Sequence, residues 1–192
     1  MKKILLILFL VYHSLILSQN LVPNPSFEEY NYLPTDVAQG KKCIATWKFP
    51  NYPGKGDYYH DNSTSKKANT EKNYFGKQTP HSGNAYVGIC LTKDFREYLQ
   101  VKLINPLVKN ETYIISLFIS CADKAYLSTT NEFNIVFSKN SFNISGNDDL
   151  IIPPKIQFLA TNKFNTKKEW EELIPIMNQN TRYKLLKNTC YV

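Results

Sequence analysis

The sequence predicts an all-β domain built as a two-sheet antiparallel sandwich, and three observations support this fold class. The chain of 192 residues contains 13 Tyr and 11 Phe but only 7 Gly, and aromatic residues favour strands over helices. Several short segments alternate apolar and polar residues with a period of two, which is typical of half-buried strands. Clusters of Pro, Gly, Asn and Ser separate these segments, as turns do in β-sandwiches.

The first eighteen residues are predicted to be a cleavable export signal. Lys2 and Lys3 precede an apolar run over residues 4–12, and the small residue Ser18 ends the segment. A membrane anchor is the alternative, but an anchor needs about 20 apolar residues, and His13 interrupts this run. We therefore predict cleavage after Ser18, no transmembrane span after cleavage, and a mature chain that is secreted, periplasmic or associated with the outer membrane.

Four segments are predicted as strands. They cover residues 85–91, 98–103, 112–120 and 132–138. Residues 112–120 show the alternation most clearly, with one apolar face made of Tyr113, Ile115, Leu117 and Ile119. The predicted core joins the inward faces of these strands to the N-terminal segment, and it includes Phe27, Tyr86, Leu99, Leu103, Tyr113, Ile115, Leu117 and Phe133.

The C-terminal part of the chain has a weaker pattern. A helical stripe fits Trp170, Leu173, Ile174 and Met177, although Pro175 opposes its continuation. We predict a sandwich domain over residues 19–177 and an irregular tail over residues 178–192, which would leave the fold incomplete at its C-terminus. In the competing interpretation, a closing strand is formed by Leu185, Leu186, Tyr191 and Val192, and Cys190 pins it to Cys43.

Charge and cysteine content exclude some classes of function. The formal net charge of +7 comes mostly from scattered lysines, whereas nucleic-acid binding usually shows as a clustered basic stripe. We therefore expect no nucleic-acid partner. The four cysteines, at positions 43, 90, 121 and 190, allow three disulfide pairings in an oxidising compartment, and sequence alone does not choose among them. Buried free thiols are an equal alternative for Cys90 and Cys121.

No catalytic constellation is visible, so the sequence predicts a non-enzymatic protein. After the export signal the only histidines are His60 and His81, and no G-x-S-x-G motif is present. Paired carboxylates could cleave glycosides, but nothing in the sequence brings any two of the loop carboxylates together. The candidates are Asp57, Asp61, Asp94 and Glu97.

A family resemblance begins at residues 20–30, which read NLVPNPSFEEY. It continues through Trp47, residues 56–59 (GDYY), residues 76–89 (GKQTPHSGNAYVGI) and residues 96–120. Over about residues 20–140 the chain resembles an exported domain found at the front of many outer-membrane-protein-A-like proteins of Gram-negative bacteria. More broadly, its N-x-S-F-E opening resembles carbohydrate-binding modules of the galactose-binding-like fold, which implies a jelly-roll sandwich.

The chain departs from this family pattern in two places. Leu33-Pro34 stands where family members usually have Cys-Pro. The Gly-rich closing strand that usually follows a tryptophan, here matched by Trp170, has no counterpart.

The predicted ligand site lies in and beside the long aromatic, polar segment over residues 50–80. Sugar rings pack their C–H faces on aromatic rings while nearby polar groups fix the hydroxyls. Such a composition occurs at Trp47, Asp57, Tyr58 and Tyr59, and it predicts a glycan or cell-envelope polymer as the ligand. The alternative is that Trp47 belongs to the core and the two tyrosines brace the loop.

Two further expectations accompany this site. The resemblance implies a structural calcium near Glu28 of the N-x-S-F-E motif, and the alternative for Glu28 is an ordinary strand-end carboxylate. The second function class is a structural or protein-interaction domain of the cell envelope, with an envelope protein as partner and no sugar site. An uncovered sheet edge or a flat polar surface would favour that class.

Overall fold

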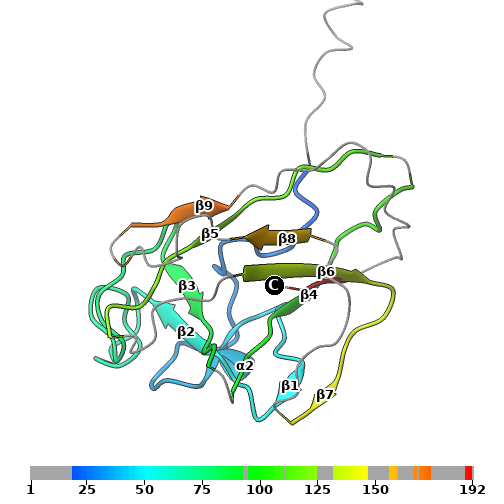
Figure 1. Cartoon of the computed structure of the whole chain (residues 1–192). Coiled ribbons are helices and arrows are strands. Elements are labelled where there is room, and N and C mark those ends of the chain that lie inside the picture. Colours follow the sequence, from blue (N-terminus) through cyan, green and yellow to red (C-terminus); the bar gives the residue numbers. More distant parts are fainter. Residues whose placement is uncertain are drawn as a thin grey trace, which may run out of the picture.

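The structure, a computed structural model, describes residues 19–92, 95–109, 111–124, 132–146, 156–159, 167, 169–173 and 189–191. The predicted export signal and the loop carboxylate Asp94 lie outside these residues. Across the described part of the chain the fold is all-β, as predicted: beside short strands there is one four-residue helix, α2 (Gly40–Cys43) (Figure 1). No helix of this part has the length and apolarity needed to cross a bilayer.

The largest sheet has four strands in the order β4-β10-β6-β8, all paired antiparallel. Their bounds are β4 (Gln100–Lys102), β10 (Thr189–Tyr191), β6 (Glu132–Ser138) and β8 (Ile156–Leu159). Strand β10 lies between β4 and β6 and pairs with both, so Thr189–Tyr191 joins these two strands into one sheet.

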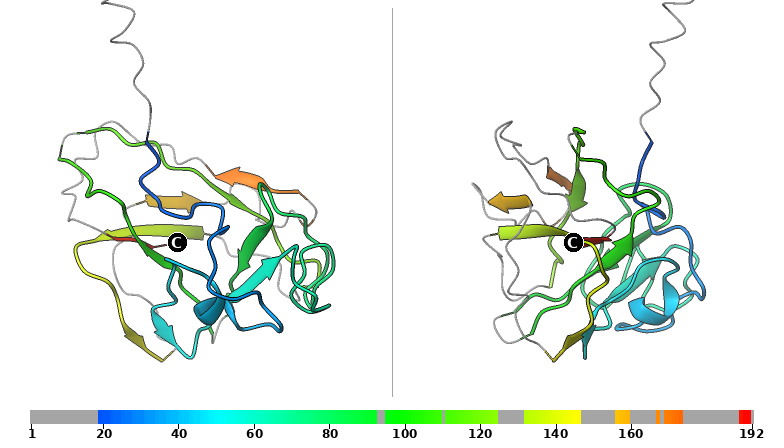
Figure 2. Two further views of the ribbon diagram at one scale, coloured as in Figure 1. Left: turned by 180° about the vertical axis from the view of Figure 1, so that it is seen from behind. Right: turned by 90° about the vertical axis from the view of Figure 1, so that its right-hand side faces the viewer.

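Three strand pairs accompany this sheet. Two are antiparallel: β2 (Asp57–His60) with β3 (Ala85–Gly88), and β5 (Leu117–Ile119) with β9 (Glu171–Leu173). The third is the parallel pair of β1 (Asn51–Tyr52) and β7 (Ile144–Ser145). The two opposite views in Figures 1 and 2 both place β3 near β9, to one side of β6.

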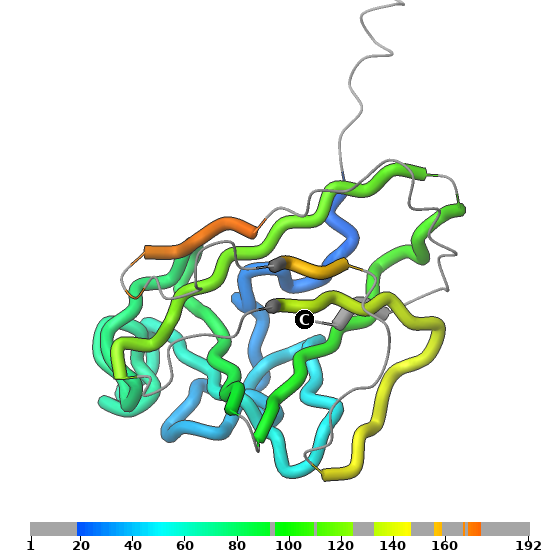
Figure 3. Tube along the Cα trace, viewed as in Figure 1, coloured from blue at the N-terminus to red at the C-terminus, as the bar shows by residue number. Residues whose placement is uncertain are grey.

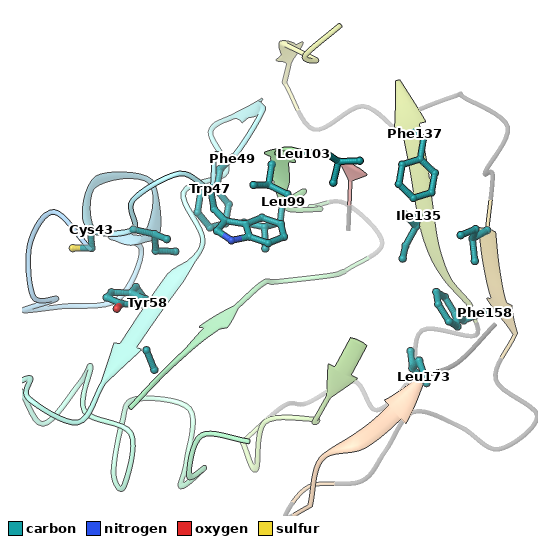
Figure 4. Close-up of a cluster of buried hydrophobic side chains, with 14 residues drawn as sticks. Cys43, Trp47, Phe49, Tyr58, Leu99, Leu103, Ile135, Phe137, Phe158 and Leu173 are labelled. Atoms are coloured by element: carbon teal, nitrogen blue, oxygen red, sulfur yellow. The ribbon is translucent and has the colours of Figure 1, made fainter. Parts of the chain in front are cut away.

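The core lies between the four-stranded sheet and the β2–β3 and β5–β9 pairs. Tyr58 of β2 and Leu173 of β9 belong to the same buried cluster as Val101 of β4 and Ile135 of β6. Figure 4 shows Tyr58 on one side of the cluster and Ile135 on the other, with Trp47 and Phe49 between them. Burying this apolar surface is the main favourable contribution to the stability of the fold.

The period-two pattern predicted side-chain directions better than strand lengths. In the segment 112–120, Ile115, Leu117 and Ile119 pack against the core, whereas Ile114 is 90% exposed. Tyr113, which was expected in the core, is partly buried but is not among the residues packed there. Only Leu117–Ile119 forms a strand there, because β9 offers three residues for pairing. The segment at 132–138 forms β6 over its full predicted length, with partners on both sides.

The C-terminal expectations need two corrections. The helical stripe expected around Trp170 and Leu173 is wrong at Glu171–Leu173, which forms strand β9 because β5 provides a pairing partner. The irregular tail expected over residues 178–192 contains a strand, since Thr189–Tyr191 forms β10. Cys43 carries a free thiol, so the disulfide from Cys190 to Cys43 in the competing interpretation is absent. Of the closing strand in that interpretation, Tyr191 belongs to β10, whereas Leu185, Leu186 and Val192 lie outside the described residues.

Candidate ligand-binding surface

The N-x-S-F-E opening folds into a turn held by its own side chains. The buried Asn24 side chain donates to the carbonyls of Glu29 (2.8 Å) and Ala45 (3.1 Å) and accepts from the Glu29 N–H (2.9 Å). Phe27 packs on Trp47 with a ring-centroid distance of 5.2 Å. The motif therefore has a structural role at the start of the domain.

Glu28 fastens this opening to the turn before β3. Its Oε1 accepts from the backbone N–H of Asn84 at 2.8 Å, and its Oε2 accepts from the Asn84 side chain at 3.1 Å. Both oxygens therefore face N–H donors, whose positive ends occupy positions that a cation would need. The described residues contain no group of three or more His, Cys, Asp or Glu side chains arranged to hold a metal. The two hydrogen bonds favour the alternative for Glu28, a carboxylate that anchors a turn.

The three aromatic residues of the predicted sugar site are buried. Trp47 is 6% exposed and its indole donates to the Asn24 carbonyl at 2.9 Å. Tyr58 is fully buried and its hydroxyl donates to the Phe27 carbonyl at 2.8 Å. Tyr59 is 3% exposed. None of these rings presents a face to a sugar, so the alternative interpretation, core and loop support, is the one that fits them.

The candidate catalytic carboxylates that the structure describes serve as internal hydrogen-bond acceptors. The buried Glu97 accepts from the backbone N–H groups of Lys55 (2.9 Å), Gly56 (2.8 Å) and Cys90 (2.9 Å). Asp57 accepts from the Ala38 N–H at 2.5 Å, and burial raises the pKa of its carboxyl. These contacts join separate segments of backbone, which is a structural role.

Exposed aromatic rings gather elsewhere, where β5 and β9 meet the turn before β3. The imidazole of His81 stacks on the ring of Phe118, with a centroid distance of 3.5 Å and an interplanar angle of 16°. Trp170 lies edge-on to His81 at 6.4 Å. We call these three residues the aromatic platform. His81 is exposed, Phe118 is 37% exposed and Trp170 is partly buried, so the platform presents ring surface to solvent.

Pairing of β5 with β9 brings the platform together. Phe118 is paired with Glu172, two residues after Trp170, so these three side chains share the outer face of the pair. Figure 3 shows residues 169–173 running beside residues 111–124. The Trp170 indole donates to the Thr79 carbonyl at 2.8 Å, which ties the strand pair to the segment that carries His81.

Buried tyrosines support the platform from below. Trp170 lies edge-on to Tyr86 at 5.7 Å, and Tyr86 stacks on Tyr59 at 4.8 Å. Tyr59 is in turn hydrogen-bonded to Asp57. Tyr59, one residue of the predicted sugar site, thus supports the platform through Tyr86. A rigid aromatic surface loses little conformational entropy on binding.

Polar groups flank the platform. The Ser120 hydroxyl, two residues after Phe118, donates to the Gln78 side-chain oxygen at 3.0 Å. Glu172 is exposed beside Phe118. Aromatic rings bordered by amide, hydroxyl and carboxylate groups have the composition of a surface that holds a sugar.

Sequence reasoning missed the platform because its three rings come from distant segments. His81 was expected only to shape a turn, Phe118 was a strand residue, and Trp170 belonged to a helical stripe. One signal was present: the alternation in residues 112–120 turns Phe118 outward, where an aromatic ring is not needed for the core.

Comparison with other proteins identifies no relative of this chain. No protein-family model matches it, and no characterised protein or solved structure is significantly similar to it.

Proposed function

We propose that the exported chain is a non-catalytic binding module of the cell envelope and that it holds a glycan or another envelope polymer on the aromatic platform. The observation that carries this proposal is the stack of His81 on Phe118 with Trp170 beside it, exposed and braced from below. The all-β fold with a core between two groups of strands supports a galactose-binding-like jelly roll. Calcium has no part in this proposal.

The test compares platform variants with an exposed aromatic elsewhere. Phe118→Ala and Trp170→Ala should each lower affinity for the bound glycan about tenfold, because a stacked ring contributes on the order of 1.5 kcal/mol. Tyr52, which is 73% exposed in β1, gives the matched control Tyr52→Ala. Binding is measured first on a glycan array and then by retardation in native gels that contain the polymer.

Two results would overturn the proposal. One is a mature protein that binds no glycan or envelope polymer. The other is binding that Phe118→Ala and Trp170→Ala leave as strong as Tyr52→Ala does.

A second candidate function is a protein-interaction domain of the envelope. The observation that favours it is a set of exposed apolar side chains before β5: Ile104, Val108 and Ile114, which are 53%, 55% and 90% exposed. Such side chains are typical of protein contacts when they lie together. Replacing all three by Ser should abolish recovery of an envelope protein after cross-linking, while glycan binding stays unchanged.

A further inference from the structure

We infer that the platform selects uncharged glycans and that Glu172 is the residue that sets this selectivity. The inference rests on the proposed function and names the class of ligand for the same site. It follows from where the β5–β9 register places the Glu172 carboxylate.

Glu172 lies directly opposite Phe118 in the antiparallel pair. Directly paired side chains project from the same face of a sheet, with Cβ atoms about 4.5–5.5 Å apart. Trp170, two residues earlier, projects from the same face. The carboxylate therefore borders a sugar that stacks on Phe118.

The carboxylate is exposed and available for a ligand. Within the described part of the chain, the Glu172 carboxylate accepts no hydrogen bond and forms no ion pair, and the one ion pair there joins Lys67 to Asp36. This contrasts with Glu97, whose oxygens accept from backbone N–H groups, and with Glu28, whose oxygens accept from the backbone and the side chain of Asn84. Glu172 thus differs from the carboxylates that have a structural role.

A carboxylate at this place distinguishes ligands by charge. It accepts hydrogen bonds from the hydroxyls of a neutral sugar, and hydrogen bonds to a charged group are stronger than neutral ones. It repels a uronate, sialate or sulfate group held at the same distance. Gln78 and Ser120, whose side chains are hydrogen-bonded to each other beside the platform, are uncharged and suit hydroxyls as well. Neutral polysaccharide is therefore the ligand class that fits the site.

The test uses Glu172→Gln, which keeps the shape of the side chain and removes its charge. Glu169→Gln is the matched control, because Glu169 is an exposed carboxylate of the same segment and the change in net charge is identical. Both variants and the wild type are applied to an array that carries neutral, uronate-containing, sialylated and sulfated glycans. They are then titrated with the neutral glycans that bind, and with hydroxyethylcellulose and carboxymethylcellulose as a neutral and an acidic polymer of one backbone.

The expected result is binding of the wild type to neutral glycans, reduced about tenfold by Glu172→Gln and unchanged by Glu169→Gln. Glu172→Gln should also gain affinity for acidic glycans relative to the wild type. The inference would be overturned if the wild type bound only acidic glycans, or if Glu172→Gln and Glu169→Gln had the same affinities. In both cases the effect of Phe118→Ala on binding would still decide the proposed function. Absence of any glycan binding would overturn both proposals together.

Discussion

The buried carboxylate of Glu97 offers the sharpest test of how this fold is held together. Its two oxygens accept three backbone N–H groups, from Lys55, Gly56 and Cys90. Glu97→Gln keeps the shape but leaves one acceptor oxygen. In the best arrangement this oxygen keeps the Lys55 and Gly56 bonds, while the new amide group faces the Cys90 N–H.

The magnitude follows from these three bonds. A hydrogen bond to a charged group contributes about 1.5–3 kcal/mol and a neutral one about 0.5–1.5 kcal/mol. Each of the two weakened bonds loses about 1–1.5 kcal/mol and the lost bond about 1.5–3 kcal/mol, so the free energy of unfolding falls by about 3.5–6 kcal/mol. This is a large part of the roughly 5–15 kcal/mol that is usual for a domain.

Urea unfolding followed by tryptophan fluorescence and circular dichroism measures this loss. Glu71 is exposed, so Glu71→Gln repeats the change in charge and should leave the free energy of unfolding unchanged within about 0.5 kcal/mol. A loss for Glu97→Gln below about 1 kcal/mol would refute the reasoning, because it would mean that the three N–H groups find other acceptors.

Three further predictions concern the faces, turns and titration of the fold. Leu117→Ala should lower the free energy of unfolding in urea by about 2–3 kcal/mol, because Leu117 packs on the core. Ile114 is 90% exposed, so Ile114→Ala should leave the free energy of unfolding almost unchanged. Equal losses would mean that the two faces of this segment are assigned wrongly. Gly83→Ala should lower the melting temperature more than Gly146→Ala. Both glycines have positive φ, but a Cβ at Gly83 would lie 2.2 Å from the Oε1 of Glu28, whereas a Cβ at Gly146 meets nothing within 4 Å. Equal shifts in melting temperature would contradict the packing of the turn at Gly83. Burial lowers the pKa of His60 below its usual 6.5, so below pH 6.5 the unfolded chain takes up a proton that the folded chain does not. The free energy of unfolding should therefore be at its full value above pH 6.5 and fall as the pH drops through the folded-state pKa. His60→Gln should flatten this fall in a pH series of urea titrations, and an unchanged slope would exclude His60 as its cause.

Local pattern predicted much of the strand content. The alternation over residues 112–120 separated partly buried from exposed side chains as far as Phe118, because the period of two is a property of the extended backbone itself. It did not do so over residues 132–138, where Val136 is buried as well as Ile135 and Phe137. Strand ends were less predictable. Residues 112–116 have the same alternation as β5 but are not part of a strand, because a strand also needs a paired neighbour.

The site was the weakest part of the prediction. Trp47, Tyr58 and Tyr59 have the composition of a sugar site, yet all three are buried. Aromatic residues fill cores as readily as they line binding surfaces, and residue type alone does not distinguish these roles. Burial depends on what packs above each ring, and for Tyr59 one such neighbour is Tyr86.

The sequence by itself determined the all-β class, the direction of side chains along residues 112–118 and the basic charge of the chain. The tertiary structure decided that His81, Phe118 and Trp170 meet at one surface and that Glu172 borders Phe118. It also decided that Thr189–Tyr191 lies between β4 and β6. The physical reason is the distance along the sequence over which the interactions act. Alternation is set by each residue and its neighbours in the chain. The pairing of β5 with β9 and the position of β10 depend on contacts between segments tens of residues apart.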